Sequence, residues 1–325
     1  MWVRFAGLLL MAMLSVAPAN VSAQLYPNRP IKLIVPYPPG GGVDLMGRIV
    51  AENLSENLGV PVVVTHQPGG AGTVGSDAVR RAEPDGYTLL FQASVFIFGP
   101  QVVKATPYSP LTDFTPIAHV ADVPIILVVN PKVAANNLAE LVEVMRKRPR
   151  DFNVAVSAPG AAGHLTTLAF LRYLNVNPGP EIVLYRGTGL GLTDVIAGTS
   201  HVMTETVGVL MPQVKSGRVR GLAVTGSKRS PLAPDVPTFA EAGSAKIEIA
   251  SWYGVWGPPN MPPAIVERLN KALEKVTASP AFVAKLESLG ITPRYKATAE
   301  FKTFIDAEAR WGVDLLKSMN VKATE

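Results

Sequence analysis

The sequence predicts an α/β protein built from two lobes. Short apolar strands alternate with helical segments along most of the chain, which is typical of βαβ units. The 325 residues exceed the roughly 100–200 residues of a usual single domain. Glycine-rich loops follow strands in both halves of the chain, and a hydrophobic content of 48% with 17% charged residues indicates a folded globular protein.

The strand and helix signals can be placed in order along the chain. Apolar and β-branched runs predict strands over residues 31–35, 60–65, 88–91, 125–129, 153–157, 182–185 and 221–224. Apolar positions three and four apart predict helices over residues 44–58, 75–81, 138–146 and 164–174. The order of the strands in the sheet does not follow from these signals.

The C-terminal part of the chain has a different character. Pro262-Pro263 opens a helix with apolar residues four positions apart, and residues 280–289 form a second helix that ends before Gly290. Thr298 is expected to cap a third helix. We expect these helices to cover a lobe rather than to carry chemistry.

Residues 1–23 have the features of a secretory signal peptide. Arg4 precedes an apolar stretch from Phe5 to Val16, and small residues end the segment at Ser22-Ala23. The apolar stretch is shorter than the about 20 residues that span a bilayer. We therefore expect export to the periplasm and a mature chain that begins near Gln24, with an uncleaved membrane anchor as the alternative.

Residue types that support catalysis or cofactor binding are absent or badly spaced. The chain has no cysteine, which excludes disulfides and thiolate chemistry. The histidines lack metal-ligand spacing, no serine lies in a GxSxG elbow, and no glycine loop matches a P-loop or GxGxxG. Ser157 and His164 could form a nucleophile and its base, but hydrogen bonding to an anion is the simpler role. We predict no catalytic residue, no metal and no cofactor.

The formal net charge of +5 comes from scattered Lys and Arg residues. The one basic cluster, at residues 146–150, falls where a helix is expected to end, and the helix dipole favours cations there. We therefore expect this cluster to be solvated, and we expect no nucleic-acid partner.

The stretch VPYPPGGGVD, residues 35–44, carries the clearest functional signal. Three consecutive glycines remove every Cβ between a strand and a helix start, where unpaired N–H groups and the helix dipole attract anions. Pro38-Pro39 stiffens the approach, and Asp44 is placed to cap the helix or to hold a water or ligand donor. A tight turn without a ligand is the alternative for this loop taken alone.

The same arrangement recurs three times. Glycine-rich loops occupy residues 68–75, 158–164 and 186–191, so each half of the chain holds two such loops. In a parallel sheet these loops gather at the carboxyl ends of the strands, where ligands bind. Two lobes that face each other across a cleft lined by backbone amides would suit a small anion, most simply a carboxylate.

Eight sequence blocks occur in order along the chain. They are RPIKLIVPYPPGGGVD, QPGGAGTVGSDAV, EPDGYTLLF, SAPGAAGHL, LYRGTG, VKSGRVRGLAVTGSKRSPLAPDVPTFAEAG, WYGVWGPPNMPP and LESLGITP. Together they resemble the extracytoplasmic solute receptors of tripartite tricarboxylate transporters, the Bug-type receptors. The resemblance extends over nearly the whole mature chain, from Tyr26 to about Val321.

This resemblance implies a type II periplasmic binding protein. In that fold two α/β lobes are joined by two crossovers, and they close on the ligand by hinge motion. The first lobe would contain residues 24–121 and 235–325, and the second lobe would contain residues 122–234. A monomer is the default expectation.

The resemblance also implies which residues bind the ligand. The first-lobe residues are Tyr37, Pro39, Gly40, Gly41, Asp44, Gly70, Ala71, Gly72 and Ser94. They are expected to hold one carboxylate of the ligand, partly through ordered waters, which bond nearly as well as direct partners. The second-lobe residues, expected to select the distal part of the ligand, are Ser157, Gly160, His164, Tyr185, Gly187 and Glu205.

Some positions depart from the pattern of these receptors. Glu205 stands where Asp is common, and Thr204 replaces a frequent aromatic residue. His201 stands where an acid is usual, and His66-Gln67 replaces the common Asn-Arg. The carboxylate-binding half is therefore expected to be retained. A Glu205 that faces the ligand would either accept a hydrogen bond from an amine or hydroxyl, or repel a second carboxylate.

These observations predict a periplasmic receptor without enzymatic activity. It would capture a small organic carboxylate and deliver it to the membrane permease subunits of a tripartite tricarboxylate-type transporter. The alternative is a periplasmic ligand sensor that feeds a signalling partner. Dicarboxylates, aromatic acids and amino acids are all candidate ligands.

Overall fold

One curled sheet connects the two halves of the molecule. The computed structural model describes residues 26–321 and 323, apart from residues 105, 186 and 245, so the predicted signal peptide lies outside the described residues. The strands are β1 (Ile31–Val35), β2 (Val62–His66), β3 (Thr88–Ala93), β4 (Thr115–Val129), β5 (Asn153–Val156), β6 (Glu181–Leu184), β7 (Val202–Thr206), β8 (Arg220–Val224), β9 (Ala250–Gly257) and β10 (Thr292–Lys296). Their order in the sheet is β2-β1-β3-β9-β4-β7-β5-β6, and β8 and β10 also pair with β4.

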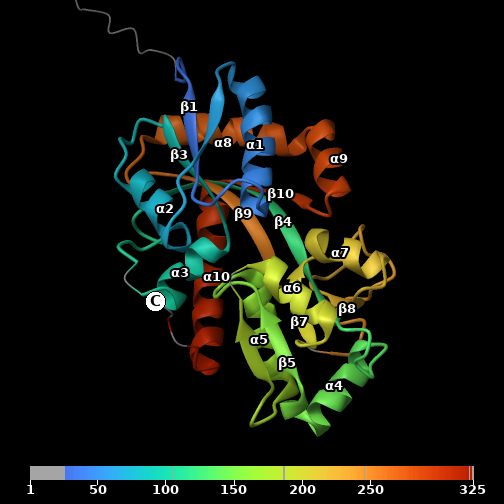
Figure 1. Cartoon of the computed structure of the whole chain (residues 1–325). Coiled ribbons are helices and arrows are strands. Elements are labelled where there is room, and N and C mark those ends of the chain that lie inside the picture. Colours follow the sequence, from blue (N-terminus) through green and yellow to red (C-terminus); the bar gives the residue numbers. More distant parts are fainter. Residues whose placement is uncertain (1–25, 105, 186, 245, 322, 324–325) are drawn as a thin grey trace, which may run out of the picture.

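Helices surround the strands of each half. They are α1 (Gly42–Leu58), α2 (Thr73–Arg80), α3 (Val95–Val102), α4 (Leu138–Lys147), α5 (Ala162–Leu174), α6 (Thr188–Ala197), α7 (Val207–Lys215), α8 (Pro263–Ala278), α9 (Pro280–Ser288) and α10 (Thr298–Ser318). Figure 1 shows α1, α2, α8 and α9 around the strands of one half and α4 to α7 around those of the other.

The 15-residue strand β4 belongs to both halves. Up to Pro124 it pairs with β9, and from Ile125 onward it pairs with β7 and β8. We call β1–β3, β9, β10 and the first part of β4 the first lobe, and β5–β8 with the second part of β4 the second lobe. Figure 1 shows β4 crossing from one lobe to the other.

The strand directions make the two lobes face each other. β1 is parallel to β2 and β3, and β9 is antiparallel to both β3 and β4, so β1–β3 run in the direction of β4, toward the second lobe. β5 is parallel to β6 and β7, whereas β7 is antiparallel to β4, so β5–β7 run toward the first lobe. The carboxyl ends of the two sets of strands therefore point toward each other.

The segment between β8 and β9 contacts the second lobe before the chain returns to the first lobe at β9. Thr238 forms a parallel bridge with Val224, and the N–H of Phe239 donates to the carbonyl of Val224 at 3.0 Å. The ring of Phe239 also lies 6.1 Å from the ring of Phe170 in α5. The lobe boundary expected at residue 235 stays a prediction, and these contacts involve residues just beyond it.

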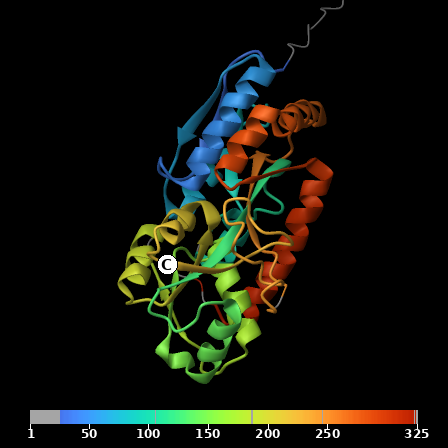
Figure 2. The same ribbon diagram turned by 90° about the vertical axis from the view of Figure 1, so that its right-hand side faces the viewer.

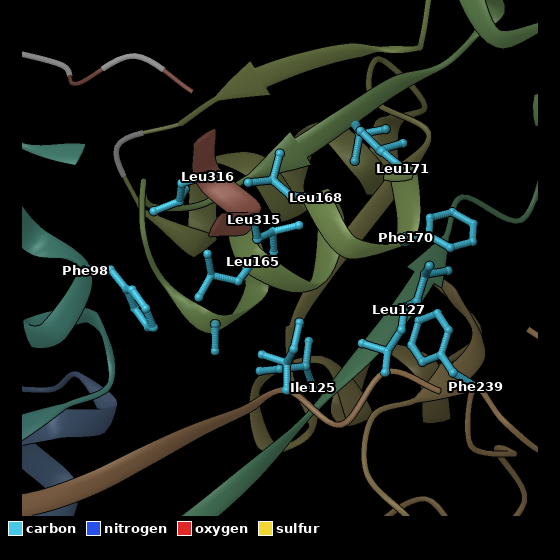
Figure 3. Close-up of a cluster of buried hydrophobic side chains, with 14 of the residues drawn as sticks. Phe98, Ile125, Leu127, Leu165, Leu168, Phe170, Leu171, Phe239, Leu315 and Leu316 are labelled. Carbon is cyan, nitrogen blue, oxygen red and sulfur yellow. The ribbon is translucent and has the colours of Figure 1, made fainter. Parts of the chain in front are cut away.

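Helix α10 packs against both lobes. Near its start, the ring of Phe301 lies 5.1 Å from the Trp256 ring of β9. Near its end, Leu315 belongs to a buried apolar cluster that includes Leu165 and Leu168 of α5, shown in Figure 3. Figure 2 shows the helix extending from the first lobe to the second. An apolar core therefore joins the lobes independently of the sheet.

Several observed elements match the sequence prediction, and others were not predicted. β1 spans the predicted residues 31–35, and α4 ends at Lys147, within the basic cluster. The apolar pattern predicts only the end of β4, because Pro116 and Pro124 interrupt it. It does not predict α3, because Phe96, Ile97 and Phe98 are all buried and leave no polar face.

The strand β7 and the cap of α10 also differ from expectation. β7 is not predicted because its sequence, VMTET, ends in polar residues. The prediction that Thr298 caps the last helix is wrong, since the N-cap position is Ala297. The Thr298 hydroxyl donates instead to the carbonyl of Ile117 at 2.8 Å, which ties α10 to β4.

Replacement of Leu315 by Ala should lower the free energy of unfolding by about 2–5 kcal/mol, because it removes a buried side chain from the shared cluster. Urea unfolding followed by circular dichroism measures this loss. Leu111→Ala is the control, because Leu111 is 37% exposed and its truncation should cost about 0.5 kcal/mol or less. Similar small losses in both variants would contradict the packing of α10 described above.

Candidate functional site

The first glycine loop leads from β1 into α1 and leaves backbone N–H groups without helical partners. Gly41 is the N-cap residue, and no side chain caps the helix there. The first N–H groups of any helix lack an intrahelical acceptor. A Cβ added to Gly40 or Gly41 would meet no atom within 4 Å, so space for a ligand lies beside the loop. Pro39, before these glycines, is exposed.

Asp44, in the first turn of α1, holds this loop in place. Its buried carboxylate accepts hydrogen bonds from the N–H of Gly40 at 2.8 Å, from Nε2 of His66 at 2.7 Å and from Nε of Arg48 at 2.8 Å. Burial raises the pKa of Asp44, but these donors more than offset it and hold the pKa below its usual value. Asp44 thus positions the loop, and its contact with a ligand stays a prediction.

The second glycine loop packs against the first. Its residues Gly70, Ala71 and Gly72 all have positive φ, at 54°, 52° and 95°. A Cβ on Gly72 would lie 2.9 Å from the hydroxyl of Tyr37, so only glycine allows this approach. The structure therefore brings together the residues predicted on these two loops.

Tyr37 supplies a buried hydroxyl beside the loops. Among the described residues, none makes a hydrogen bond of good geometry with this hydroxyl, although the amide of Gln92 lies near it. Burial raises the pKa of Tyr37 to about 12, and Gln92 offsets part of the shift. Tyr37 is therefore a neutral hydrogen-bond donor at neutral pH.

A second tyrosine at this place, Tyr253, is absent from the predicted site. It lies on β9 opposite Ala93, the last residue of β3, and its hydroxyl would lie 3.0 Å from a Cβ on Gly42. The predicted residue Ser94 is buried next to it, because its N–H donates to the carbonyl of Trp252 at 2.8 Å. Tyr253 falls in the block WYGVWGPPNMPP, whose apolar residues suggest core rather than a site.

In the second lobe, the side chain of Glu205 forms hydrogen bonds with residues at the carboxyl ends of β5, β6 and β7. Its Oε2 accepts hydrogen bonds from the hydroxyls of Ser157 at 2.7 Å and Thr188 at 3.0 Å. Its Oε1 accepts the N–H of Thr206 at 2.8 Å. Gly187, the N-cap residue of α6, donates its N–H to the carbonyl of Ser157 at 3.0 Å. Thr188 is absent from the predicted site, although it follows Gly187 directly.

The third glycine loop has the same local geometry as the first. Gly160 has a positive φ of 75°, and its N–H donates to Nδ1 of His164 at 3.0 Å. Gly40 likewise has a φ of 93° and donates to Asp44. In both loops the acceptor follows the glycine by four residues and lies in the first turn of the helix. The two lobes therefore hold their loops by equivalent hydrogen bonds, one to an anion and one to a neutral ring.

Tyr185 differs from the other predicted residues. Its hydroxyl donates to Oδ2 of Asp194 at 2.7 Å and lies 3.0 Å from the hydroxyl of Ser200. The structure therefore places this hydroxyl with partners of its own lobe, apart from the group around Glu205.

Two observations place the loops of the two lobes next to each other. The pKa of Tyr253 is raised to about 12, first by burial and then by the negative charge of Glu205 in the other lobe. A Cβ on Gly160 would lie 2.8 Å from Val102 of α3, so the third loop contacts the first lobe. The carboxyl ends of both strand sets thus form one region.

A separate cavity of about 470 Å³ lies between α5 and α10. Its wall carries charges of both signs, from Arg172, Lys246, Glu248 and Glu308, and contains none of the predicted binding residues. Burial raises the pKa of Glu308, and the indole N–H of Trp252 donates to its carboxyl at 3.2 Å. The cavity therefore lies apart from the glycine loops, which carry the predicted binding residues.

The described part of the chain has neither a metal-binding cluster nor a membrane-spanning helix. It holds no group of three or more His, Cys, Asp or Glu side chains that could bind a metal ion. Among these same residues, no helix combines the length and apolar character needed to cross a bilayer.

Comparisons with known proteins agree with this geometry. The family model described as "Tripartite tricarboxylate transporter family receptor" matches residues 46–321. BugT of Bordetella pertussis is 36% identical over 296 residues, which cover 90% of each chain. The chain belongs to this receptor family.

Solved structures of similar proteins have the same two-lobed fold. Rpa4515 of R. palustris, solved with adipate, gives a TM-score of 0.82 at 31% identity and covers 92% of this receptor and 100% of that chain. The periplasmic binding protein BugD gives a TM-score of 0.78 at 32% identity, with the same coverage. The protein is therefore a periplasmic solute-binding receptor of the type II fold and not an enzyme, as the sequence predicts.

Among the residues expected to depart from the receptor pattern, His66, His201 and Thr204 have hydrogen-bond partners inside the lobes. His66 binds Asp44, and Nδ1 of His201 accepts the N–H of Asn153 at 2.9 Å. The Thr204 hydroxyl donates to the carbonyl of Gly163 at 2.6 Å. Thr204 thus binds the third glycine loop, and Glu205 binds Ser157 and Thr188 after β5 and β6.

The buried ring of His164 should make the stability of the receptor depend on pH. Burial lowers its pKa from 6.5 to about 4, so the unfolded chain binds a proton that the folded chain does not. Stability should be complete above pH 6.5 and fall as the pH drops toward 4, by up to about 3 kcal/mol.

Urea unfolding of the wild type and His164→Asn between pH 7 and pH 4 checks this expectation. Asparagine can still accept the N–H of Gly160 but takes up no proton, so the variant should lose less stability over this range. The other histidines contribute equally to the pH dependence of stability in both proteins. Identical pH profiles would contradict the neutral, buried state of His164.

Proposed function

We propose that this receptor captures a small organic carboxylate between its lobes and delivers it to the membrane permease of a tripartite tricarboxylate-type transporter. The observation that carries the proposal is the first loop, where Asp44 holds a glycine turn beside uncapped N–H groups of α1. A helix N-terminus of this kind favours a carboxylate. The adipate bound by the similar protein Rpa4515 supports this class of ligand.

The proposed contacts divide between the lobes. The loops of the first lobe, with the hydroxyls of Tyr37 and Tyr253, would hold the carboxylate directly or through water. The group around Glu205, with Gly160 and His164, would contact the rest of the ligand. The lobes, which we propose divide near residues 121 and 235, would close on it as a monomer by motion about the β4 crossing.

Export is part of the proposal. Residues 1–23 would direct secretion and be removed, which leaves the mature receptor free in the periplasm. N-terminal sequencing of receptor purified from the periplasm would begin near Gln24 in that case, and a chain that retained Met1 would instead be membrane-anchored.

Replacement of Gly41 by Val should weaken carboxylate binding by about 100-fold, equivalent to one or two lost charge-assisted hydrogen bonds. Gly41 has φ −86° and ψ 170°, which valine adopts readily, and its Cβ would contact no protein atom. Loss of binding would therefore result from exclusion of the ligand and not from misfolding. Isothermal titration calorimetry, with a ligand first found by a thermal-shift screen of organic acids, measures the change.

Gly179→Val provides the matched control for this substitution. Gly179 lies in the loop between α5 and β6, where an added Cβ makes only an ordinary contact of 3.6 Å. This variant should bind as the wild type does. Equal affinity of Gly41→Val and wild type would show that the first loop does not hold the carboxylate.

Delivery to the permease requires a second measurement. Uptake of the radiolabelled ligand by cells with the intact permease should fall to background when the receptor gene is deleted. Uptake should return with the wild-type receptor and not with Gly41→Val. Undiminished uptake without the receptor, together with tight binding in vitro, would contradict delivery and favour the role of a sensor.

A further inference from the structure

The side chain of Glu205 determines which hydrogen-bonding groups the second lobe offers a ligand. Its carboxylate accepts bonds from the Ser157 hydroxyl, the Thr188 hydroxyl and the Thr206 N–H. Two carboxylate oxygens provide about four acceptor sites, so one site stays free for a further donor. The side chain is partly exposed, which keeps that site accessible.

The two hydroxyls bound to Glu205 lose their own donor function. A hydroxyl has a single proton and two lone pairs, and here both protons point at Oε2 of Glu205. Toward any ligand, Ser157 and Thr188 therefore present lone pairs only. Glu205 and its two partners together form a group of acceptors that needs donors from the ligand.

This acceptor group lies at the carboxyl ends of β5–β7, which point toward the first lobe. Among the described residues, which do not include Arg186, no Lys or Arg side chain is paired with Glu205. The charge acts on the Tyr253 hydroxyl, which itself lies beside the first turn of α1. Because the strands of the two lobes point toward each other, a ligand held by the N–H groups of α1 would have Glu205 on its opposite side.

We infer that the ligand of this receptor carries a protonated amine together with its carboxylate. An ammonium group supplies several N–H donors and a positive charge, which match the acceptor group of Ser157, Thr188 and Glu205. A second carboxylate would instead meet like charge and oxygen lone pairs, which disfavours dicarboxylates. This inference rests on the proposed function, because it assumes that the first loop holds a carboxylate.

The test compares acids of matched length that differ only at the distal end. The pairs are succinate and β-alanine, glutarate and 4-aminobutanoate, and adipate and 5-aminopentanoate. The affinities are measured by calorimetry of the full mature receptor at pH 7. For the pair whose length fits best, the amino acid should bind about 10-fold or more tightly than the dicarboxylate. A difference of this size is the scale of one repulsive charge interaction.

Glu205→Gln should reverse this preference. Glutamine keeps the size of the side chain but removes its charge, and it leaves the Ser157 and Thr188 hydroxyls free to donate to the ligand. The amino acid should then bind about 10-fold more weakly, and the dicarboxylate should bind more tightly. Glu181→Gln, at the exposed start of β6, is the matched control and should keep the wild-type preference. Thermal melts confirm that each variant folds.

The outcomes separate this inference from the proposed function. Tighter binding of a dicarboxylate by the wild type, or an unchanged preference in Glu205→Gln, would overturn the inference and leave carboxylate capture intact. Binding of none of these six acids would also overturn it. Among these binding results, the absence of binding across a wide screen of organic acids would overturn the proposed function as well.

Discussion

The direction of the strands in one shared sheet is the constraint on which the site depends. β4 continues from one lobe into the other, and its antiparallel pairing with β9 on one side and β7 on the other makes the remaining strands point inward. Loops that follow parallel strands hold the N-termini of helices. The same sheet therefore brings together helix N-termini from chain segments more than 100 residues apart, such as those at Gly42 and Thr188.

The first and third glycine loops stay in place because a polar side chain of the following helix binds each of them. Gly40 donates to Asp44, and Gly160 donates to His164, with the same spacing. These bonds hold the glycines in left-handed conformations and leave other N–H groups free. The charge differs between the lobes, since Asp44 is an anion that accepts hydrogen bonds from His66 and Arg48, whereas burial keeps His164 neutral. The loops thus share a geometry but differ in electrostatics.

Membership of the receptor family accounts for the fold and the glycine loops, but not for the choice of ligand. In the function proposed here, that choice would depend on side chains at the carboxyl ends of β5, β6 and β7. In this receptor Glu205 uses the protons of two neighbouring hydroxyls, and so one residue sets the hydrogen-bonding character of three. A relative with a different residue at this position would present other groups on the same backbone.

The sequence by itself determined the α/β class, the glycine loops and most of the residues gathered around them. These features depend on local signals, namely apolar periodicity and glycines where the chain turns tightly. It could not determine the role of Asp44, whose carboxylate accepts hydrogen bonds from protein donors, or the partners of the Tyr185 hydroxyl, which are Asp194 and Ser200. It also left out Tyr253 and Thr188, because neither carries a local signal of binding. Their positions follow from strand pairing across the sheet and from Glu205, and long-range contacts of this kind exist only in the folded chain.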